Sequence, residues 1–106
     1  MNTFKDREKT YEAKYVHDQE TNFRINARRN KLLGQWAAGL LGLTGAEAEN
    51  YAKEVVKSDF KTAGDDDVVA KVSADFKAKG VEMTESRLRI EMRNLLDEAR
   101  RQVTTE

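Results

Sequence analysis

The sequence predicts an all-α protein: a small four-helix bundle with a flexible N-terminal segment. Its 106 residues contain no proline, so the residue that breaks helices most strongly is absent. Large apolar residues recur three or four positions apart instead of alternating, which is the spacing of one face of a helix. A chain of this length supports a single core, so we expect one bundle domain in residues 23–106, preceded by residues 1–22.

Residues 1–22, called here the N-terminal segment, are mostly charged and polar. Phe4, Tyr11 and Tyr15 fall on one narrow helical stripe, at positions i, i+7 and i+11. Because most helical stability comes from packing against other elements, this thin stripe should leave the segment frayed or disordered in the isolated protein. Two interpretations remain open: a solvated helix end without a role, or a segment that completes its helix against a partner.

The polar run of residues 17–22 separates this segment from the denser apolar pattern that begins at Phe23. It predicts a hinge or boundary. The run begins with His17, the only histidine, which we expect to be exposed and neither catalytic nor metal-bound.

The first core helix is predicted between residues 23 and 41. Its apolar face holds Phe23, Ala27, Leu33, Trp36, Ala37, Leu40 and Leu41. Gly42 can adopt the left-handed conformation that ends a helix, and Leu43 can fold back onto the apolar face as the contact that accompanies such a cap.

Four cations form a basic strip on this helix. Arg24, Arg28, Arg29 and Lys31 are the only charged residues between positions 23 and 43. They form either a solvated flank, whose long stems cover apolar surface, or a contact for an anion or a partner.

The second helix is predicted from Gly45 to Lys61. Thr44 and Glu47 have the spacing of a capping box, in which each side chain accepts a hydrogen bond from a backbone N–H of the first turn. Its core face holds Ala48, Tyr51, Ala52, Val55, Val56 and Phe60.

Asp65, Asp66 and Asp67 introduce a third helix, because acidic side chains are favoured at the positive end of a helix dipole. We expect these residues to cap the helix and not to bind metal, since the spaced oxygen ligands, the glycine and the distal glutamate of a calcium loop are missing. The helix carries Val68, Val69, Val72 and Phe76 on its apolar face and ends at Gly80.

Thr84 is the expected N-cap of the fourth helix. Its apolar positions are Leu88, Met92, Leu95, Leu96, Ala99 and Val103, and residues 103–106 should fray. The four helices predict a bundle in which the first two form an antiparallel pair and the last two pack across them.

The composition excludes several classes of function. The chain has no cysteine, one histidine and no glycine-rich phosphate loop, so no group meets the geometry of nucleophilic or general acid–base catalysis, and we expect no enzyme, cofactor or metal. It has no apolar run long enough to cross a bilayer and no signal peptide, which predicts a soluble, cytoplasmic protein without membrane insertion. The net charge of zero argues against broad nucleic-acid binding.

Several stretches of the chain resemble the zeta subunit family, small inhibitors of the alphaproteobacterial F-type ATP synthase. They occur in the family's order and span most of the chain: Phe4 with Asp6-Arg7-Glu8, Ala27 to Gly34 with Trp36-Ala37-Ala38, Leu41 to Gly45, Tyr51-Ala52-Lys53 with Val55-Val56, and Gly64-Asp65-Asp66-Asp67-Val68. The resemblance implies an inhibitor of ATP hydrolysis by the catalytic head of the synthase, with the N-terminal segment as an inserting helix.

The same resemblance implies which residues bind the partner. Carried onto this chain, they are Phe4, Arg7, Glu8, Tyr11 and Tyr15. It also implies a protein that is monomeric when free and peripheral to the inner face of the plasma membrane when bound to the synthase.

A second hypothesis is a nucleic-acid or nucleotide-binding module that uses the basic strip near Arg28, with Trp36 as a stacking platform. The place of Trp36 on the core face and the zero net charge weigh against it. A salt titration separates the two hypotheses, because phosphate contacts give a steep salt dependence.

Overall fold

The structure, a computed structural model, contains four α-helices. It describes the backbone of residues 3–59 and 64–106, and the side chains from residue 18 onward within those ranges. The helices are α1 (Thr3–Leu40), α2 (Gly45–Ser58), α3 (Asp66–Ala78) and α4 (Glu85–Thr104), and the described residues include no strand. The predicted all-α class with four helices is confirmed.

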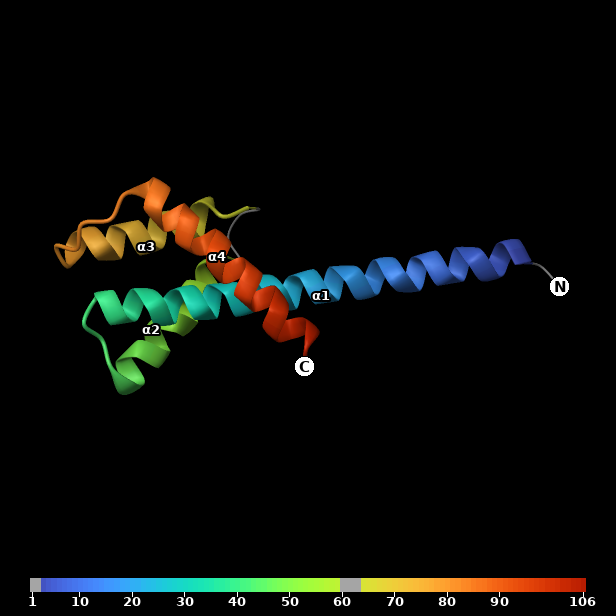
Figure 1. The fold of residues 1–106 in the computed structure, drawn as a ribbon, viewed down its shortest axis with the longest axis horizontal. Helices are drawn as coiled ribbons and strands as arrows, with labels where there is room; N and C mark the ends of the chain where they lie inside the picture. Colours follow the sequence, from blue (N-terminus) through green and yellow to red (C-terminus); the bar gives the residue numbers. More distant parts are fainter. Residues whose placement is uncertain (1–2, 60–63) are drawn as a thin grey trace.

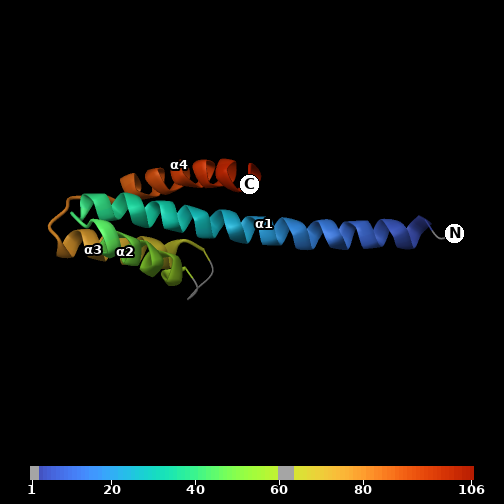
Figure 2. The ribbon, with the colours of Figure 1, turned by 90° about the horizontal axis from the view of Figure 1, so that it is seen from below.

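Helix α1 is the central element of the fold. It packs extensively against α2 and α4, which lie on opposite sides of it, while α3 contacts both α2 and α4 (Figure 2). The prediction that the last two helices pack on the first two agrees with these contacts, since α4 packs on α1 and α3 packs on α2. None of the described helices has an apolar stretch long enough to cross a membrane.

The N-terminal half of α1 extends well beyond the other three helices (Figure 1). This helix has 38 residues, and the molecule is 66 Å long but only 25 by 21 Å across. The helix continues without interruption through residues 18–22, where the sequence predicted a hinge. The division into an N-terminal segment and a bundle domain at residue 22 stays a prediction.

The two predicted glycine caps are confirmed. Gly42 has φ of +78° and Gly80 has φ of +73°. The backbone N–H of Leu43 donates to the carbonyl of Ala38 at 2.9 Å, and that of Val81 donates to Phe76 at 2.8 Å. These hydrogen bonds, which span five residues along the chain, are those of Schellman motifs. They provide donors for carbonyl groups in the last turns of α1 and α3 and turn the chain sharply.

The predicted N-caps are only partly correct. Thr84 accepts a hydrogen bond from the backbone N–H of Arg87 at 3.1 Å, as expected. Thr44 and Asp65 occupy the N-cap positions of α2 and α3, but neither side chain makes a capping hydrogen bond, so the capping box with Glu47 does not form. Helix α2 ends at Ser58, and Phe60, predicted on its core face, lies outside the described residues.

The main core joins all four helices. Its fully or nearly fully buried residues are Leu33, Ala37, Ala38, Leu41, Tyr51, Val55, Val68, Val69, Val72, Phe76, Leu88 and Met92. Trp36 is half-buried against this core and meets Phe76 edge to face, with ring centroids 5.9 Å apart. A smaller satellite cluster of Ile25, Ala99 and Val103 joins only α1 and α4.

Two residues predicted for the core face of α1 are exposed: Phe23 at 59% and Leu40 at 45%. The buried face is centred instead on the row Ile25, Arg29, Leu33, Ala37 and Leu41, whose members are four residues apart. Leu33, Ala37 and Leu41 of this row were predicted correctly. Ile25 and Arg29 were not, and an arginine does not belong to an apolar pattern. Val103, predicted to fray, is 5% exposed inside helix α4.

Gly34 lets α1 and α2 cross closely. A Cβ atom at this position would lie 2.5 Å from Cα and 3.0 Å from Cβ of Ala52, a distance that requires one helix to move. We therefore expect Gly34→Ala to lower the free energy of unfolding by about 2 kcal/mol, measured by denaturant titration. Gly39→Ala is the matched control: a Cβ there meets nothing within 4 Å, so it should raise stability by up to about 1 kcal/mol. Equal effects of the two substitutions would contradict the close crossing.

Candidate partner-binding site

The five residues predicted to bind a partner all belong to the projecting half of α1, which comprises residues 3–24. Phe4, Arg7, Glu8, Tyr11 and Tyr15 fall between Thr3 and residue 17 on this helix. Their side chains, and that of His17, lie outside the described residues. The structure therefore assigns them to a continuous helix, and their individual contacts stay predictions.

The burial pattern marks where the projecting half leaves the bundle. Asp18, Gln19, Glu20 and residues 22–24 are exposed, and the first buried side chain is that of Ile25. The described side chains before Ile25, those of residues 18–24, thus lie outside the bundle core. A partner could surround this part of α1 without disturbing the buried contacts of the bundle.

The last turns of α4 hold α1 at this point. Ile25 packs in the satellite cluster with Ala99 and Val103, supported by Leu32 and Leu96. Beside the cluster, Arg24 and Arg28 both donate to the carboxylate of Glu106, and Arg28 Nη1 donates to Gln102 Oε1 at 2.9 Å. This contact was not predicted from the sequence, because residues 103–106 were expected to fray.

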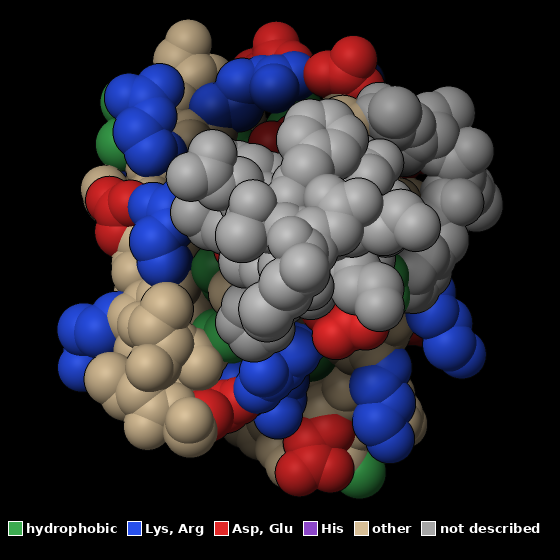
Figure 3. All heavy atoms as spheres, turned by 90° about the vertical axis from the view of Figure 1, so that its right-hand side faces the viewer, with side chains coloured by type: hydrophobic (Ala, Val, Ile, Leu, Met, Phe, Trp, Pro, Cys, Tyr) green, Lys and Arg blue, Asp and Glu red, His purple; other side chains and the backbone are tan. Residues whose placement is uncertain are grey.

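The paired arginines change the interpretation of the basic strip. Arg24 and Arg28 bind Glu106, and Arg29 binds Asp65, so Lys31 is the one member of the strip without an ion pair among the described residues. The face at the N-terminal end of the molecule carries both signs of charge interspersed (Figure 3). Neutralised cations contribute little counterion release, so the strip does not form the positive footprint that the nucleic-acid hypothesis requires.

A buried polar network links α1 to the two ends of the α2–α3 connection. The side chains of Arg29 and Asn30 are 3% and 1% exposed. Arg29 Nη2 donates to Asp65 at 2.7 Å, Arg29 Nε donates to Asn30 Oδ1 at 2.8 Å, and Asn30 Nδ2 donates to Asp59 at 2.9 Å. The hydrogen bond from Arg29 holds the pKa of Asp65 below its usual range, against the opposing effect of burial.

This network corrects two predictions. Arg29 was expected either on a solvated flank or in a contact with an anion or a partner, and Asp65 was expected to cap α3 like its neighbours. Asp65 instead turns to Arg29, whereas Asp66 pairs with Arg89 at the surface, at 3.0 Å. The aspartates diverge, and the described residues contain no group of three acidic, histidine or cysteine side chains that could hold a metal ion.

A second polar cluster fixes α2 to α3. Tyr51 Oη donates to Asp75 at 2.8 Å, Lys71 Nζ donates to the same carboxylate at 3.0 Å, and the Lys71 ammonium lies 5.3 Å from the centre of the Tyr51 ring. Burial, together with the hydrogen bond to Asp75, raises the pKa of the Tyr51 phenol far above its usual range. The phenol stays protonated and donates, which suits a fixed structural contact between the helices.

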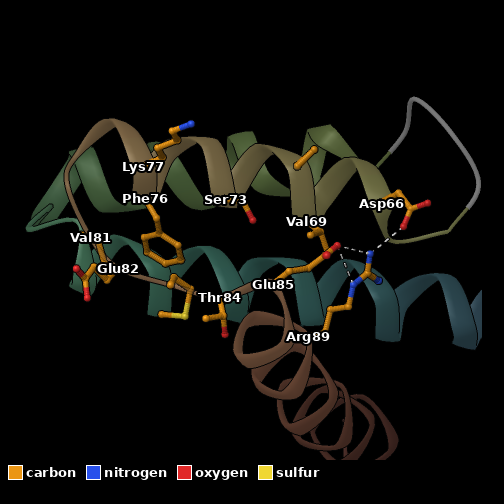
Figure 4. A pocket seen from close by; sticks show the side chains of 12 residues that line it. Asp66, Val69, Ser73, Phe76, Lys77, Val81, Glu82, Thr84, Glu85 and Arg89 are labelled. Carbon is orange, nitrogen blue, oxygen red and sulfur yellow. Dashed lines mark hydrogen bonds and ion pairs between the residues drawn. The ribbon is translucent and has the colours of Figure 1, made fainter.

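An open groove of about 960 Å³ runs between α3, the α3–α4 connection and the start of α4 (Figure 4). Phe76, Val81 and Met83 line one end. At the other end Arg89 is already bound by Asp66 and Glu85, at 3.0 and 3.1 Å. Because this cation is neutralised within the protein, it does not provide a charged anchor for a ligand.

Comparisons with known proteins add a family and a related fold. A family model described as ATPase inhibitor subunit zeta matches residues 1–102. A protein with a solution NMR structure is similar at 43% sequence identity, with a TM-score of 0.70, over 78% of this chain and 94% of that chain. No curated protein sequence matches the chain. The matched residues of the family model include the projecting half of α1 as well as the bundle.

Proposed function

The chain belongs to the ATPase inhibitor subunit zeta family, and from this premise we propose that it inhibits ATP hydrolysis by the catalytic head of the F-type ATP synthase by inserting the N-terminal half of α1. The family itself supports a non-catalytic, regulatory role and an interaction with ATP synthase. The insertion mechanism is our proposal.

The observation that carries this proposal is that the family match extends through the projecting part of the chain. If that part were only a solvated helix end, the family pattern would be needed only for the bundle. Residues 3–24 form about six turns of helix, roughly 33 Å long at 1.5 Å per residue. A helix of this length can enter a deep groove while the bundle remains outside.

The chemistry of the segment fits a helix that is completed by its partner. Phe4, Tyr11 and Tyr15 share one narrow stripe, which a groove can bury as apolar anchors. Arg7 and Glu8 flank the stripe and can form charged contacts at its edges. Burial of the stripe on binding compensates for the entropy lost when the segment is ordered.

We further propose that the protein acts from the cytoplasm. It would be a monomer when free and would lie at the inner face of the plasma membrane when bound to the synthase. Its partner, the catalytic head, is itself soluble, so inhibition requires no membrane insertion of this chain.

In the direct test, the chain is added to the purified catalytic head from the same organism, and the rate of ATP hydrolysis is measured. We expect saturable inhibition by the parent chain. Phe4→Ala and Tyr11→Ala should each weaken it about tenfold or more, because anchor residues dominate binding energy, and should leave the melting temperature unchanged.

Ile90→Ala is the matched control, because Ile90 is also a large apolar residue, 53% exposed, but lies on α4. It should leave inhibition intact. No inhibition by the parent chain would refute the proposed function, and equal inhibition by all variants would refute the assignment of the anchors.

A further inference from the structure

We propose that Lys31, Lys53 and Lys57 form a second docking site, which binds an acidic protein segment of the catalytic head while the N-terminal helix is inserted. The site rests on the proposed function, since it assigns a second contact to the same partner. It occupies the face formed by α1 and α2.

The three lysines surround a hollow of about 530 Å³ between the two helices. Its floor is apolar and comes from Ala52, which is 4% exposed, and from half-buried Val56. The lysines are exposed at its rim, together with Gln35 and Glu49. Such a hollow can accept one apolar side chain while the ammonium groups bind carboxylates beside it.

The absence of ion pairs among the described residues distinguishes these three lysines from the arginines of the basic strip. Within the described residues none of the three takes part in an ion pair, whereas Arg24, Arg28 and Arg29 are all bound to carboxylates of the chain. The protein thus neutralises the arginines of its basic strip and leaves Lys31 beside two more lysines of α2. Unpaired cations around an apolar floor complement an acidic, partly apolar surface.

A protein segment suits this hollow better than a nucleic acid. Glu49 at the rim repels a polyanion, and the net charge of the chain is zero, whereas nucleic-acid binding needs a broad positive surface. A peptide with separate carboxylates can approach the lysines and avoid the glutamate. Two attachment points on one partner also raise the effective concentration of the inserting helix.

The test compares two charge-reversed variants of the full chain in the hydrolysis assay. Lys31→Glu/Lys53→Glu should weaken inhibition about tenfold at low salt, and added potassium chloride should narrow the difference, since contacts between exposed charges are screened. Arg87→Glu/Arg93→Glu is the matched control. It changes the net charge equally, at two exposed residues of α4 without ion pairs among the described contacts. Helix α4 lies on the opposite side of α1 from α2 (Figure 2), so this variant should inhibit within twofold of the parent.

Crosslinking gives a second measurement, because the chain contains no cysteine. Lys53→Cys labelled with a photoreactive group should crosslink to the catalytic head, and Arg93→Cys should not. Unchanged inhibition by Lys31→Glu/Lys53→Glu, or an equal loss in both charge-reversed variants, would overturn the site. So would lysine-dependent sedimentation with phosphatidylglycerol vesicles combined with unchanged inhibition, which would assign the lysines to the membrane. Failure of the parent chain to inhibit would instead remove the proposed function on which the site rests.

Discussion

A chain that begins at Glu20 is expected to fold normally and to lose inhibition of ATP hydrolysis completely. It keeps every residue of the main core and of the satellite cluster, since the first member of either cluster in the chain is Ile25. The free energy of unfolding should therefore change by less than about 1 kcal/mol. The helical signal per residue and most of the melting temperature should persist, while the hydrolysis rate of the catalytic head should stay at its uninhibited value.

A peptide of residues 1–22 is the complementary control. It carries the proposed anchors but lacks the bundle that fixes the base of α1, so ordering it costs more and it should inhibit more weakly than the full chain. Amide hydrogen exchange of the free protein should show residues 4–15 less protected than residues 32–41. Full inhibition by the shortened chain would contradict the proposed mechanism, as would equal protection of these two stretches.

The features that the sequence predicted correctly depend on local chemistry. Gly42 and Gly80 end helices because glycine readily adopts the left-handed conformation found at both positions. Thr84 caps α4 through a hydrogen bond from the backbone N–H of Arg87, three residues further along the chain. The apolar spacing of α4 likewise predicted the buried positions of Leu88 and Met92. None of these features requires knowledge of the tertiary arrangement.

The features that the sequence did not predict depend on partners far along the chain. Arg29 binds Asp65, 36 residues away, and Asn30 binds Asp59, 29 residues away. Before these pairs are known, a buried polar residue cannot be told from an exposed one, so Arg29 was left off the core face, whereas the exposed Phe23 was included in it. The three lysines of the docking site likewise come from two helices, and they line one hollow where α1 and α2 cross closely at Gly34 and Ala52.

The candidate site shows the same division. The stripe of Phe4, Tyr11 and Tyr15 could be found from spacing, and the structure adds that α1 carries it out of the bundle. The base of that helix, where Glu106 binds two arginines beside the satellite cluster, could not be found in this way. It is formed by chain segments more than 70 residues apart.

Asp65→Ala is expected to lower the free energy of unfolding by roughly 2 to 4 kcal/mol, because it leaves the buried guanidinium of Arg29 without its carboxylate. The estimate lies at the lower end of the range for buried ion pairs, since the Asp65 side chain is 46% exposed. Asp66→Ala is the matched control from the same aspartate run. Its side chain is 88% exposed, and loss of its pair with Arg89 should change stability by less than about 1 kcal/mol. Denaturant titrations that give equal losses for both substitutions would contradict the network.

The pH dependence of stability tests the same contact without removing the side chain. The pKa of Asp65 is lowered in the folded protein from its ordinary value of 3.8 by the hydrogen bond from Arg29. When the pKa of a carboxyl group is lower in the folded than in the unfolded protein, its charged form stabilises the fold at pH values above the unfolded pKa. This stabilisation is lost as the pH falls through the folded pKa. The difference in stability between the parent chain and Asp65→Asn should therefore be constant near neutral pH and shrink below about pH 4. A difference that stays constant down to pH 2 would show that the charge of Asp65 does not stabilise the fold.

A double-mutant cycle tests the coupling of the two residues. Arg29→Met/Asp65→Ala should lower the free energy of unfolding by less than the sum of the two single substitutions, because no buried charge is left unpaired.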